Sequence, residues 1–382
     1  MKIVYIYPHL LTVAGTERVL VDKINYFAEK ENYEVMLITL EQGKMPIVFP
    51  LSAKVIHVDL DVRYYEMYRM LFIHRFFKKR SLAHVFQRRF DSVMNDFQPN
   101  IVIATTYNSH VLHIINNCKL NFKRILESHI GKSFLHHNDP VNQSNIFKWI
   151  NAFIGMKKIE KEATKFDVLV ALNQVDACDW SRYVDTKVIT NVVHLNPLGL
   201  YSNQINNRVV FVGRFSKQKG INDLFRIWKL VNQKHPDWHL DMYGDGEMRS
   251  YVCYEANRLG MNIHIYESNS NIYEQYINSS ILVLTSVYEP FGLVIPEAMS
   301  CGLPVVSFDC PYGPADIITD GVDGFLVKNR NIEDFAARVC SLIENRYLRI
   351  RMGKAAIMSS SRYRPEMIMP QWETLFEKLN SE

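Results

Sequence analysis

Short hydrophobic runs alternate with amphipathic stretches along the first half of the chain. KIVYIY at residues 2–7 precedes ERVLVDKINYFAEK at 17–30, whose apolar positions recur at helical spacing. Further apolar runs of strand length follow at residues 33–40, 54–60, 101–106, 123–128 and 168–172. Strands that are apolar on both faces and alternate with helices predict a parallel sheet with helices on both sides.

The same alternation begins again in the second half of the chain. Its apolar runs lie at residues 208–215, 238–244, 261–266, 280–286, 303–309 and 324–327. Between the two series, LNPLGLYSNQINN at 195–207 is polar and rich in turn formers, as expected of a linker. The pattern therefore predicts an α/β protein of two doubly wound, Rossmann-like domains facing a cleft.

Composition and charge narrow the class of protein. The chain has 382 residues, enough for two cores, and its net charge of +4 gives no general attraction to nucleic acid. Six cysteines occur without a CxxC, which favours free, buried thiols in a reducing compartment. The first strand begins at Lys2, with no signal peptide before it, and no apolar run reaches the roughly 18 residues of a membrane span. We therefore expect a cytoplasmic protein.

Two glutamates stand eight positions apart in SVYEPFGLVIPEAMSC, residues 286–301. Glu289 falls in the loop at the carboxyl end of a predicted strand, where ligands bind in open α/β sheets. Pro296 fits only the first turn of the helix that follows, so the amides of residues 292–294 would be unpaired donors suited to a phosphate. Glu297 lies on the face of Leu293, one turn further along.

The two carboxylates suit hydroxyl groups on either side of such a phosphate. Glu297 would bind a pair of hydroxyls like those of a ribose, and Glu289 would accept hydroxyls from the other end of the ligand. A molecule with phosphates in the middle and a sugar at each end is a nucleotide sugar. A helix-capping carboxylate and an unrelated surface glutamate remain the alternative.

A second candidate motif is VVFVGRFSKQKG at residues 209–220, a strand followed by a glycine turn and two cations. Arg214 and Lys219 would match a diphosphate, because a guanidinium binds two oxygens at once. A solvated basic loop is the alternative. A third glycine turn, with Gly244, follows the strand at 238–244 on the same sheet edge. No GxGxxG follows either first strand, which argues against a dinucleotide site.

With these motifs the chain resembles the retaining glycosyltransferases of family 4, the group 1 enzymes of bacterial polysaccharide and lipid-linked glycan synthesis. The glutamate pair resembles the family's E-x7-E motif, and VGRFSKQKG resembles its diphosphate loop. The other matching stretches are AGTERV (14–19), ESHI (127–130) and GPADIITDGVDGFLV (313–327). One departure is that Ala14-Gly15 stands where the family usually has Gly-Gly.

The resemblance implies the GT-B fold, with an acceptor domain at 1–197, a donor domain at 198–364 and a C-terminal helix at 365–382 that returns to the first domain. The catalytic residues that it implies are His129, Arg214, Lys219 and Glu289. The implied contacts of the donor are Gly15, Gly213, Arg214, Lys219, Gly244, Glu289, Phe291, Gly292, Leu293 and Glu297.

The resemblance also implies a reaction. A hexose or N-acetylhexosamine would pass from a nucleoside-diphosphate sugar, by expectation UDP-linked, to a hydroxyl of a glycan or lipid-linked acceptor with retention of configuration. No cofactor or metal is expected, because cations and helix-start amides would stabilise the leaving phosphate. A sugar-nucleotide epimerase of the same architecture and a non-catalytic nucleotide-sugar-binding protein are the alternatives.

The sequence also contains weaker signals. DLD at 59–61 matches a metal-binding pattern of transferases with another fold, but it lies at a strand end of the first domain, far in sequence from the diphosphate loop. His136 and His137 follow His129 with neither helical ligand spacing nor a carboxylate partner, which argues against a metal site. Residues 63–89 carry eight Lys or Arg against one acid, interleaved with aromatics. This segment fits either a solvated basic helix face or a helix on an anionic membrane surface, so the protein could lie peripherally at the inner face of the plasma membrane.

Overall fold

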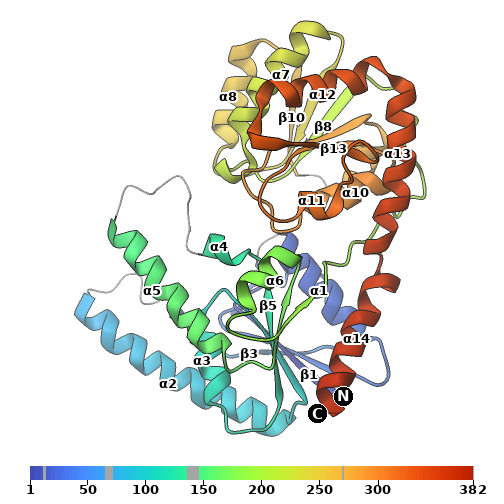
Figure 1. Cartoon of the computed structure of the whole chain (residues 1–382). Helices are drawn as coiled ribbons and strands as arrows, with labels where there is room; N and C mark the ends of the chain where they lie inside the picture. Colours follow the sequence, from blue (N-terminus) through green and yellow to red (C-terminus); the bar gives the residue numbers. More distant parts are fainter. Residues whose placement is uncertain (12–13, 65–71, 136–145, 269–270, 382) are drawn as a thin grey trace. The chain divides into compact units, whose positions relative to one another are not determined.

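The computed structural model of the chain describes residues 1–11, 14–64, 72–135, 146–268 and 271–381. These residues form two compact units (Figure 1). Unit 1 comprises Met1–Val192 and Met369–Glu382, and unit 2 comprises Val193–Ile368. The sequence placed the corresponding boundaries at 197/198 and 364/365.

Unit 1 contains a seven-stranded parallel sheet in the order β3-β2-β1-β4-β5-β6-β7. The strands are β1 (Lys2–Tyr7), β2 (Glu34–Thr39), β3 (Ile56–Asp59), β4 (Ile101–Thr105), β5 (Lys123–Ser128), β6 (Val168–Ala171) and β7 (Thr186–Val188). The helices are α1 (Gly15–Ala28), α2 (Phe72–Phe97), α3 (Ser109–Asn117), α4 (Lys132–Leu135), α5 (Ile146–Ala163) and α6 (Gln174–Trp180). Helices α2, α3 and α5 cover one face of the sheet, and α1 covers the other (Figure 1).

Unit 2 contains a six-stranded parallel sheet in the order β10-β9-β8-β11-β12-β13. The strands are β8 (Arg208–Val212), β9 (His239–Tyr243), β10 (Ile263–Tyr266), β11 (Ile281–Leu284), β12 (Val305–Phe308) and β13 (Gly324–Val327). The helices are α7 (Ile221–Lys234), α8 (Arg249–Leu259), α9 (Ile272–Ile277), α10 (Val294–Ser300), α11 (Pro314–Ile317), α12 (Ile332–Glu344) and α13 (Arg346–Ser360). Single 3-10 turns lie at Lys217–Lys219, Lys328–Arg330 and Ser361–Tyr363.

The predicted fold class is confirmed in both units. Each apolar run named above contains a strand, and both sheets have the doubly wound order in which the chain reverses direction beside its first strand. Strand β7 was not predicted, because TKV is only three residues long and holds a single large apolar side chain. All six cysteines are free, as expected from the sequence. The expectation that they are buried fails for two of them, because Cys178 is exposed and Cys253 is half-buried. Among the described residues, no helix is long and apolar enough to cross a bilayer.

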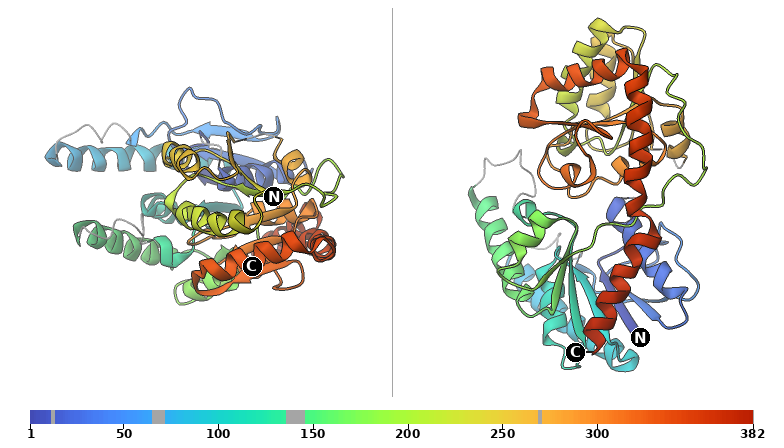
Figure 2. Two further views of the ribbon diagram at one scale, coloured as in Figure 1. Left: turned by 90° about the horizontal axis from the view of Figure 1, so that it is seen from above. Right: turned by 45° about the vertical axis from the view of Figure 1, so that its right-hand side comes forward.

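The C-terminal helix α14 (Pro365–Ser381) supplies part of the core of unit 1. The ring of Phe376 lies 5.0 Å from that of Phe27 on α1, centroid to centroid, and both side chains are fully buried. The ammonium of Lys23, also on α1, lies 4.1 Å from the ring centroid of Trp372. Figure 2 shows that α14 ends at the C-terminus, near the N-terminus. Trp372, Leu375, Phe376 and Leu379 recur at helical spacing and form the buried face of this helix.

Truncating this face should destabilise unit 1. Trp372→Ala and Phe376→Ala should each lower the free energy of unfolding by about 3–5 kcal/mol, the range for buried aromatics. Deleting 366–382 should lower the melting temperature further. Urea denaturation followed by circular dichroism measures the effect, and Asn380→Ala, exposed on the same helix, is the control. An unchanged melting temperature after the deletion would contradict the role of α14.

Candidate active site

The loop after β8 touches the loop after β11 at one edge of the unit 2 sheet. Gly220, the residue before α7, has a φ of +65°, which only glycine adopts without strain. A Cβ at Gly220 would lie 2.0 Å from the carbonyl oxygen of Thr285, so any side chain there would push the two loops apart. The hydroxyl of Thr285 in turn donates to the carbonyl of Lys219 at 2.9 Å.

An ion pair joins the two motifs that the sequence singled out. The Nζ of Lys219 lies 2.5 Å from Oε2 of Glu289, and both side chains are largely shielded from water. The Ser286 hydroxyl donates to the same Oε2 at 3.0 Å. The structure therefore places the cation of the first loop and the carboxylate of the second in one cluster, at the carboxyl ends of neighbouring strands.

Arg330 fixes the backbone of the glutamate loop, and no sequence pattern predicted this role. Its guanidinium donates to the backbone carbonyls of Ser286 at 2.7 Å and Thr285 at 3.1 Å, and it also pairs with Asp223 on α7. A basic residue in a 3-10 turn more than forty positions away carries no local pattern that points to this role. Its contact depends on the packing of the turn after β13 against the β11 loop.

Helix α10 begins as predicted. Gly292 has a φ of +89°, Pro296 lies in the first turn, and Gly302 follows the end of the helix. Glu297 is buried on this helix, and the Tyr276 hydroxyl on α9 donates to its Oε2 at 3.4 Å. Burial and the neighbouring Glu297 carboxylate raise the pKa of Tyr276 well above its usual value, so Tyr276 stays a proton donor.

The strand-like segment around Glu289 is fixed by the loop after β12. The amide of Glu289 donates to the carbonyl of Pro311 at 3.3 Å, and the amide of Gly313 donates back to Glu289 at 2.8 Å. A Cβ at Gly313 would lie 2.1 Å from the carbonyl oxygen of Phe291, which is itself buried. The segment 313–327, which the resemblance singled out, therefore begins with a glycine that the glutamate loop requires.

The remaining candidates of unit 2 lie at the same sheet edge. The amide of Gly213 donates to Tyr243 at 3.0 Å, and a Cβ at Gly244 would lie 2.0 Å from the Gly213 carbonyl oxygen. Leu293 is half-buried at the start of α10. Arg214 is exposed, and the stem of its side chain lies beside Gly246 on the neighbouring glycine turn.

In unit 1, His129 follows β5 and forms a buried charge cluster that the sequence did not predict. Its Nε2 lies 2.7 Å from Oε2 of Glu127, whose Oε1 lies 2.5 Å from the Nζ of Lys23 on α1. All three side chains are buried. Burial raises the pKa of Glu127, but Lys23 and His129 outweigh this and lower it to about 2. Gly15, the other unit 1 candidate, is the first residue of α1.

The weaker sequence signals show structural contacts or cannot be assessed. Asp59 accepts hydrogen bonds from the Thr39 hydroxyl and from the amides of Gln42 and Gly43, which fixes a turn. His136 and His137 lie outside the described residues, as does part of the basic segment at 63–89. From Phe72 onward this segment lies on α2, where Lys79, Arg80, Arg88 and Arg89 are exposed.

Comparison with known proteins assigns part of the chain to a family model. Residues 201–358 match the family model described as glycosyl transferases group 1. They form a glycosyltransferase domain. This makes the chain a transferase enzyme. The matched region includes Arg214, Lys219, Glu289 and Glu297.

Relatives extend the likeness to the whole chain. An uncharacterised glycosyltransferase of Haemophilus influenzae is 25% identical over 97% of this chain and 99% of its own length. The amylovoran biosynthesis glycosyltransferase AmsD of Erwinia amylovora is 36% identical over 44% of this chain, which spans about half of that protein. The crystal structure of TarM matches with a TM-score of 0.79 at 16% identity and covers 98% of each chain. This likeness shows that the present chain has the GT-B fold.

The buried charge cluster of this glycosyltransferase predicts a pH-dependent stability. Glu127→Gln would leave the Lys23 ammonium buried without a counter-charge, so the free energy of unfolding at pH 7 should fall by about 3–5 kcal/mol. The folded pKa of Glu127 lies below its unfolded value, so its stabilisation is complete above the unfolded pKa and is lost as the pH falls toward 2. Urea denaturation should therefore show a smaller loss at about pH 3.5 than at pH 7.

The control is Glu29→Gln, whose exposed carboxylate pairs with Lys54, and it should change the stability little. The double variant Lys23→Met/Glu127→Gln should recover part of the stability, because it removes both charges. A Glu127→Gln protein as stable as wild type at pH 7 would contradict this account of the cluster.

Proposed function

We propose that the chain is a retaining family 4 glycosyltransferase, which moves a hexose or N-acetylhexosamine from a UDP-linked sugar to a hydroxyl of a glycan or lipid-linked acceptor. The observation that carries the proposal is the Lys219–Glu289 ion pair. The pair joins a cation suited to bind phosphate and a carboxylate suited to accept hydrogen bonds from hydroxyl groups. Both lie at the sheet edge where open α/β sheets bind ligands. The E-x7-E spacing and the similar structures of TarM with UDP and of HepE with UDP-glucose support it.

Each side chain of unit 2 has a distinct task in this proposal. Arg214 and Lys219 bind the diphosphate, and their positive charge stabilises the negative charge that develops on it as the sugar leaves. The Glu289 carboxylate, oriented by Ser286, accepts hydroxyls of the transferred sugar. The Glu297 carboxylate, oriented by Tyr276, accepts the ribose hydroxyls. No metal ion is required in this scheme, because side-chain cations supply the charge.

Unit 1 holds the acceptor in this proposal, and unit 2 holds the donor. Gly15 and His129 are the residues of unit 1 with a proposed part in the reaction. Lys23 and Glu127 keep the His129 ring in one orientation, because Glu127 binds its Nε2 and is itself held by the ammonium. A fixed ring orientation is the condition for a directed hydrogen bond to a reacting sugar.

The diphosphate contacts can be tested by single substitutions. Arg214→Ala and Lys219→Ala should each weaken UDP binding by about 2 kcal/mol, roughly 30-fold, the scale for a lost charged hydrogen bond. Calorimetric titration with UDP measures this. The matched control is Lys217→Ala, an exposed lysine of the same loop, which should bind UDP like wild type. Equal losses in all three variants would indicate a nonspecific effect of loop charge.

One assay separates the proposed reaction from its alternatives. The protein is incubated with labelled UDP-sugars, with and without glycan acceptors, and the products are identified. Release of UDP that depends on an acceptor supports transfer, whereas an epimerised donor or binding alone would overturn it. Activity should persist in EDTA. Activity that is lost in EDTA and restored by Mn²⁺ would overturn the metal-free scheme.

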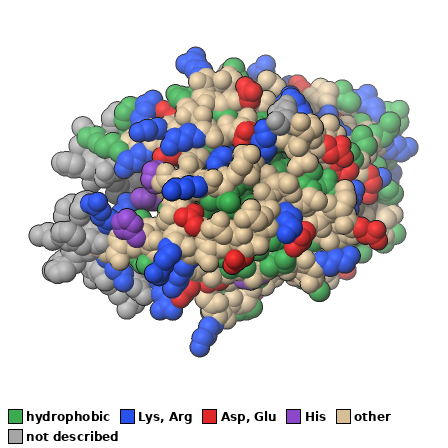
Figure 3. All heavy atoms as spheres, turned by 90° about the horizontal axis from the view of Figure 1, so that it is seen from below, with side chains coloured by type: hydrophobic (Ala, Val, Ile, Leu, Met, Phe, Trp, Pro, Cys, Tyr) green, Lys and Arg blue, Asp and Glu red, His purple; other side chains and the backbone are tan. Residues whose placement is uncertain are grey.

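We also propose that unit 1 binds an anionic membrane surface. Helix α5 has an exposed stripe of Ile150, Phe153, Ile154, Lys157, Lys158 and Lys161, at successive helical spacings. Apolar side chains occupy its first half and lysines its second, the arrangement by which a helix end enters a lipid interface. Helix α3 packs against both α2 and α5, and the basic part of α2 adds charge nearby. In Figure 3, Lys and Arg side chains lie in the left-hand part of the face shown, and others are scattered over the rest of it.

Membrane binding should depend on both kinds of side chain. Phe153→Ser/Ile154→Ser and Lys78→Ser/Lys79→Ser/Arg80→Ser should each weaken binding to anionic vesicles by about tenfold or more, given about 1 kcal/mol per cation near the surface. Vesicle co-sedimentation measures it, and binding should fall with salt. Lys44→Ser/Lys54→Ser/Lys119→Ser is the charge-matched control. Protein that stays in the supernatant at low salt would refute this proposal.

A further inference from the structure

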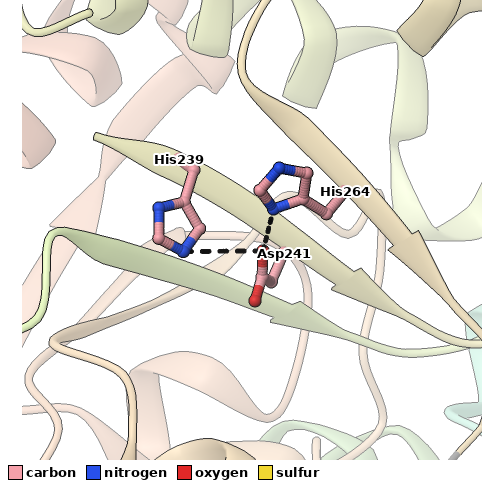
Figure 4. A group of neighbouring side chains, drawn as sticks. All are labelled: His239, Asp241 and His264. Atoms are coloured by element: carbon pink, nitrogen blue, oxygen red, sulfur yellow. Dashed lines mark hydrogen bonds and ion pairs between the residues drawn. The ribbon is translucent and has the colours of Figure 1, made fainter. Parts of the chain in front are cut away.

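Strand pairing in unit 2 gathers two histidines and an aspartate on one face of the sheet. His239 and Asp241 are two positions apart on β9, so their side chains point to the same face. The parallel register pairs Asp241 with His264 on β10, the edge strand of the sheet. Leu240 and Met242 point the other way, into the core. In Figure 4 the three polar side chains converge on one point.

The distances fit a small metal ion. Nδ1 of His264 lies 3.0 Å from Oδ1 of Asp241, and Nε2 of His239 lies 3.8 Å from the same oxygen. All three ligand atoms lie within 4.8 Å of one another. Four-coordinate zinc with ligands at about 2.0–2.2 Å separates them by about 3.3 Å, so His239 would have to move closer to Asp241 and His264 slightly away from it for an ion to bind. Within the described part of the chain, no other group of three or more His, Cys, Asp or Glu residues meets this criterion.

Arg208 on β8 fixes the carboxylate without occupying the converging oxygen. Its Nε lies 2.5 Å from Oδ2 of Asp241, whereas both histidines approach Oδ1. Asp241 is almost fully buried, so this ion pair sets the direction in which Oδ1 points. Such outer contacts orient ligands in metal sites. The guanidinium also repels a second cation, so the affinity should be moderate.

We propose that His239, Asp241 and His264 form a binding site for a divalent transition-metal ion of the zinc class. Two imidazole nitrogens and one carboxylate oxygen are ligands that Zn²⁺ prefers. His264 is half-exposed on the edge strand, so the ion has access from solvent and keeps a position for water. These residues lie within β9 and β10, whereas Lys219 and Glu289 follow the carboxyl ends of β8 and β11. The ion would therefore join two strands without touching the donor site.

Zinc titration of the full chain tests the site. After treatment with a chelator and its removal, wild type should bind one Zn²⁺ per chain by calorimetry, and Zn²⁺ should raise its melting temperature. His239→Ala and His264→Ala should each weaken that binding by at least about tenfold. The control is His235→Ala, which removes a histidine that pairs with Glu344 in the same unit. It should bind Zn²⁺ like wild type.

Cobalt gives a second, spectroscopic readout. Co²⁺ in a four-coordinate nitrogen and oxygen site absorbs visible light strongly, and this band should appear in wild type and in His235→Ala but not in His264→Asn. The polar His264→Asn substitution on the surface keeps the fold testable if His264→Ala is unstable. Equal Zn²⁺ affinity in the His239, His264 and His235 variants would overturn the proposal and leave an ordinary hydrogen-bonded His–Asp group.

Discussion

The adjacency of β8 and β11 is the constraint on which the candidate site depends. In a doubly wound sheet the connections reverse direction beside the first strand, so the loops after β8 and β11 leave the same edge as neighbours. Gly220 then allows the two backbones to touch, and Lys219 and Glu289 meet across seventy positions of sequence. Arg330 and Gly313 hold the same loops from other sides. A change in strand order would separate every one of these groups.

Both units stabilise a buried carboxylate with a lysine from another element. Glu289 pairs with Lys219, and Glu127 pairs with Lys23. A buried carboxylate without such a partner would take up a proton and lose its value as an acceptor of hydrogen bonds. In unit 2 the same lysine is the proposed phosphate ligand, so an incoming diphosphate and Glu289 would share its charge. The free site is therefore already organised around the charge that it would receive.

The sequence predicted the features that repeat locally and missed those that depend on register or distant packing. Apolar runs located the strands, and Pro296 with Gly302 located the start and end of α10. The partners of His129 were missed, because Lys23 lies on α1 and nothing in ESHI indicates it. The exposed stripe on α5 could have been found from helical spacing, but its apolar half resembles a core face until burial is known. The grouping of His264 with Asp241 depends on the pairing of β9 with β10, which no local pattern fixes.

Unit 1 is discontinuous in sequence, since Met369–Glu382 completes a core that begins with β1. A ribosome makes the chain from the amino end, so all of unit 2 is synthesised before Trp372 and Phe376 exist. Until then, the face of α1 around Phe27 has no helix to cover it. Unit 2, which is continuous, can close its core on the nascent chain, whereas unit 1 must wait with an apolar surface open to chaperones and to aggregation. Unit 1 is therefore the first unit to begin synthesis and the last to finish folding.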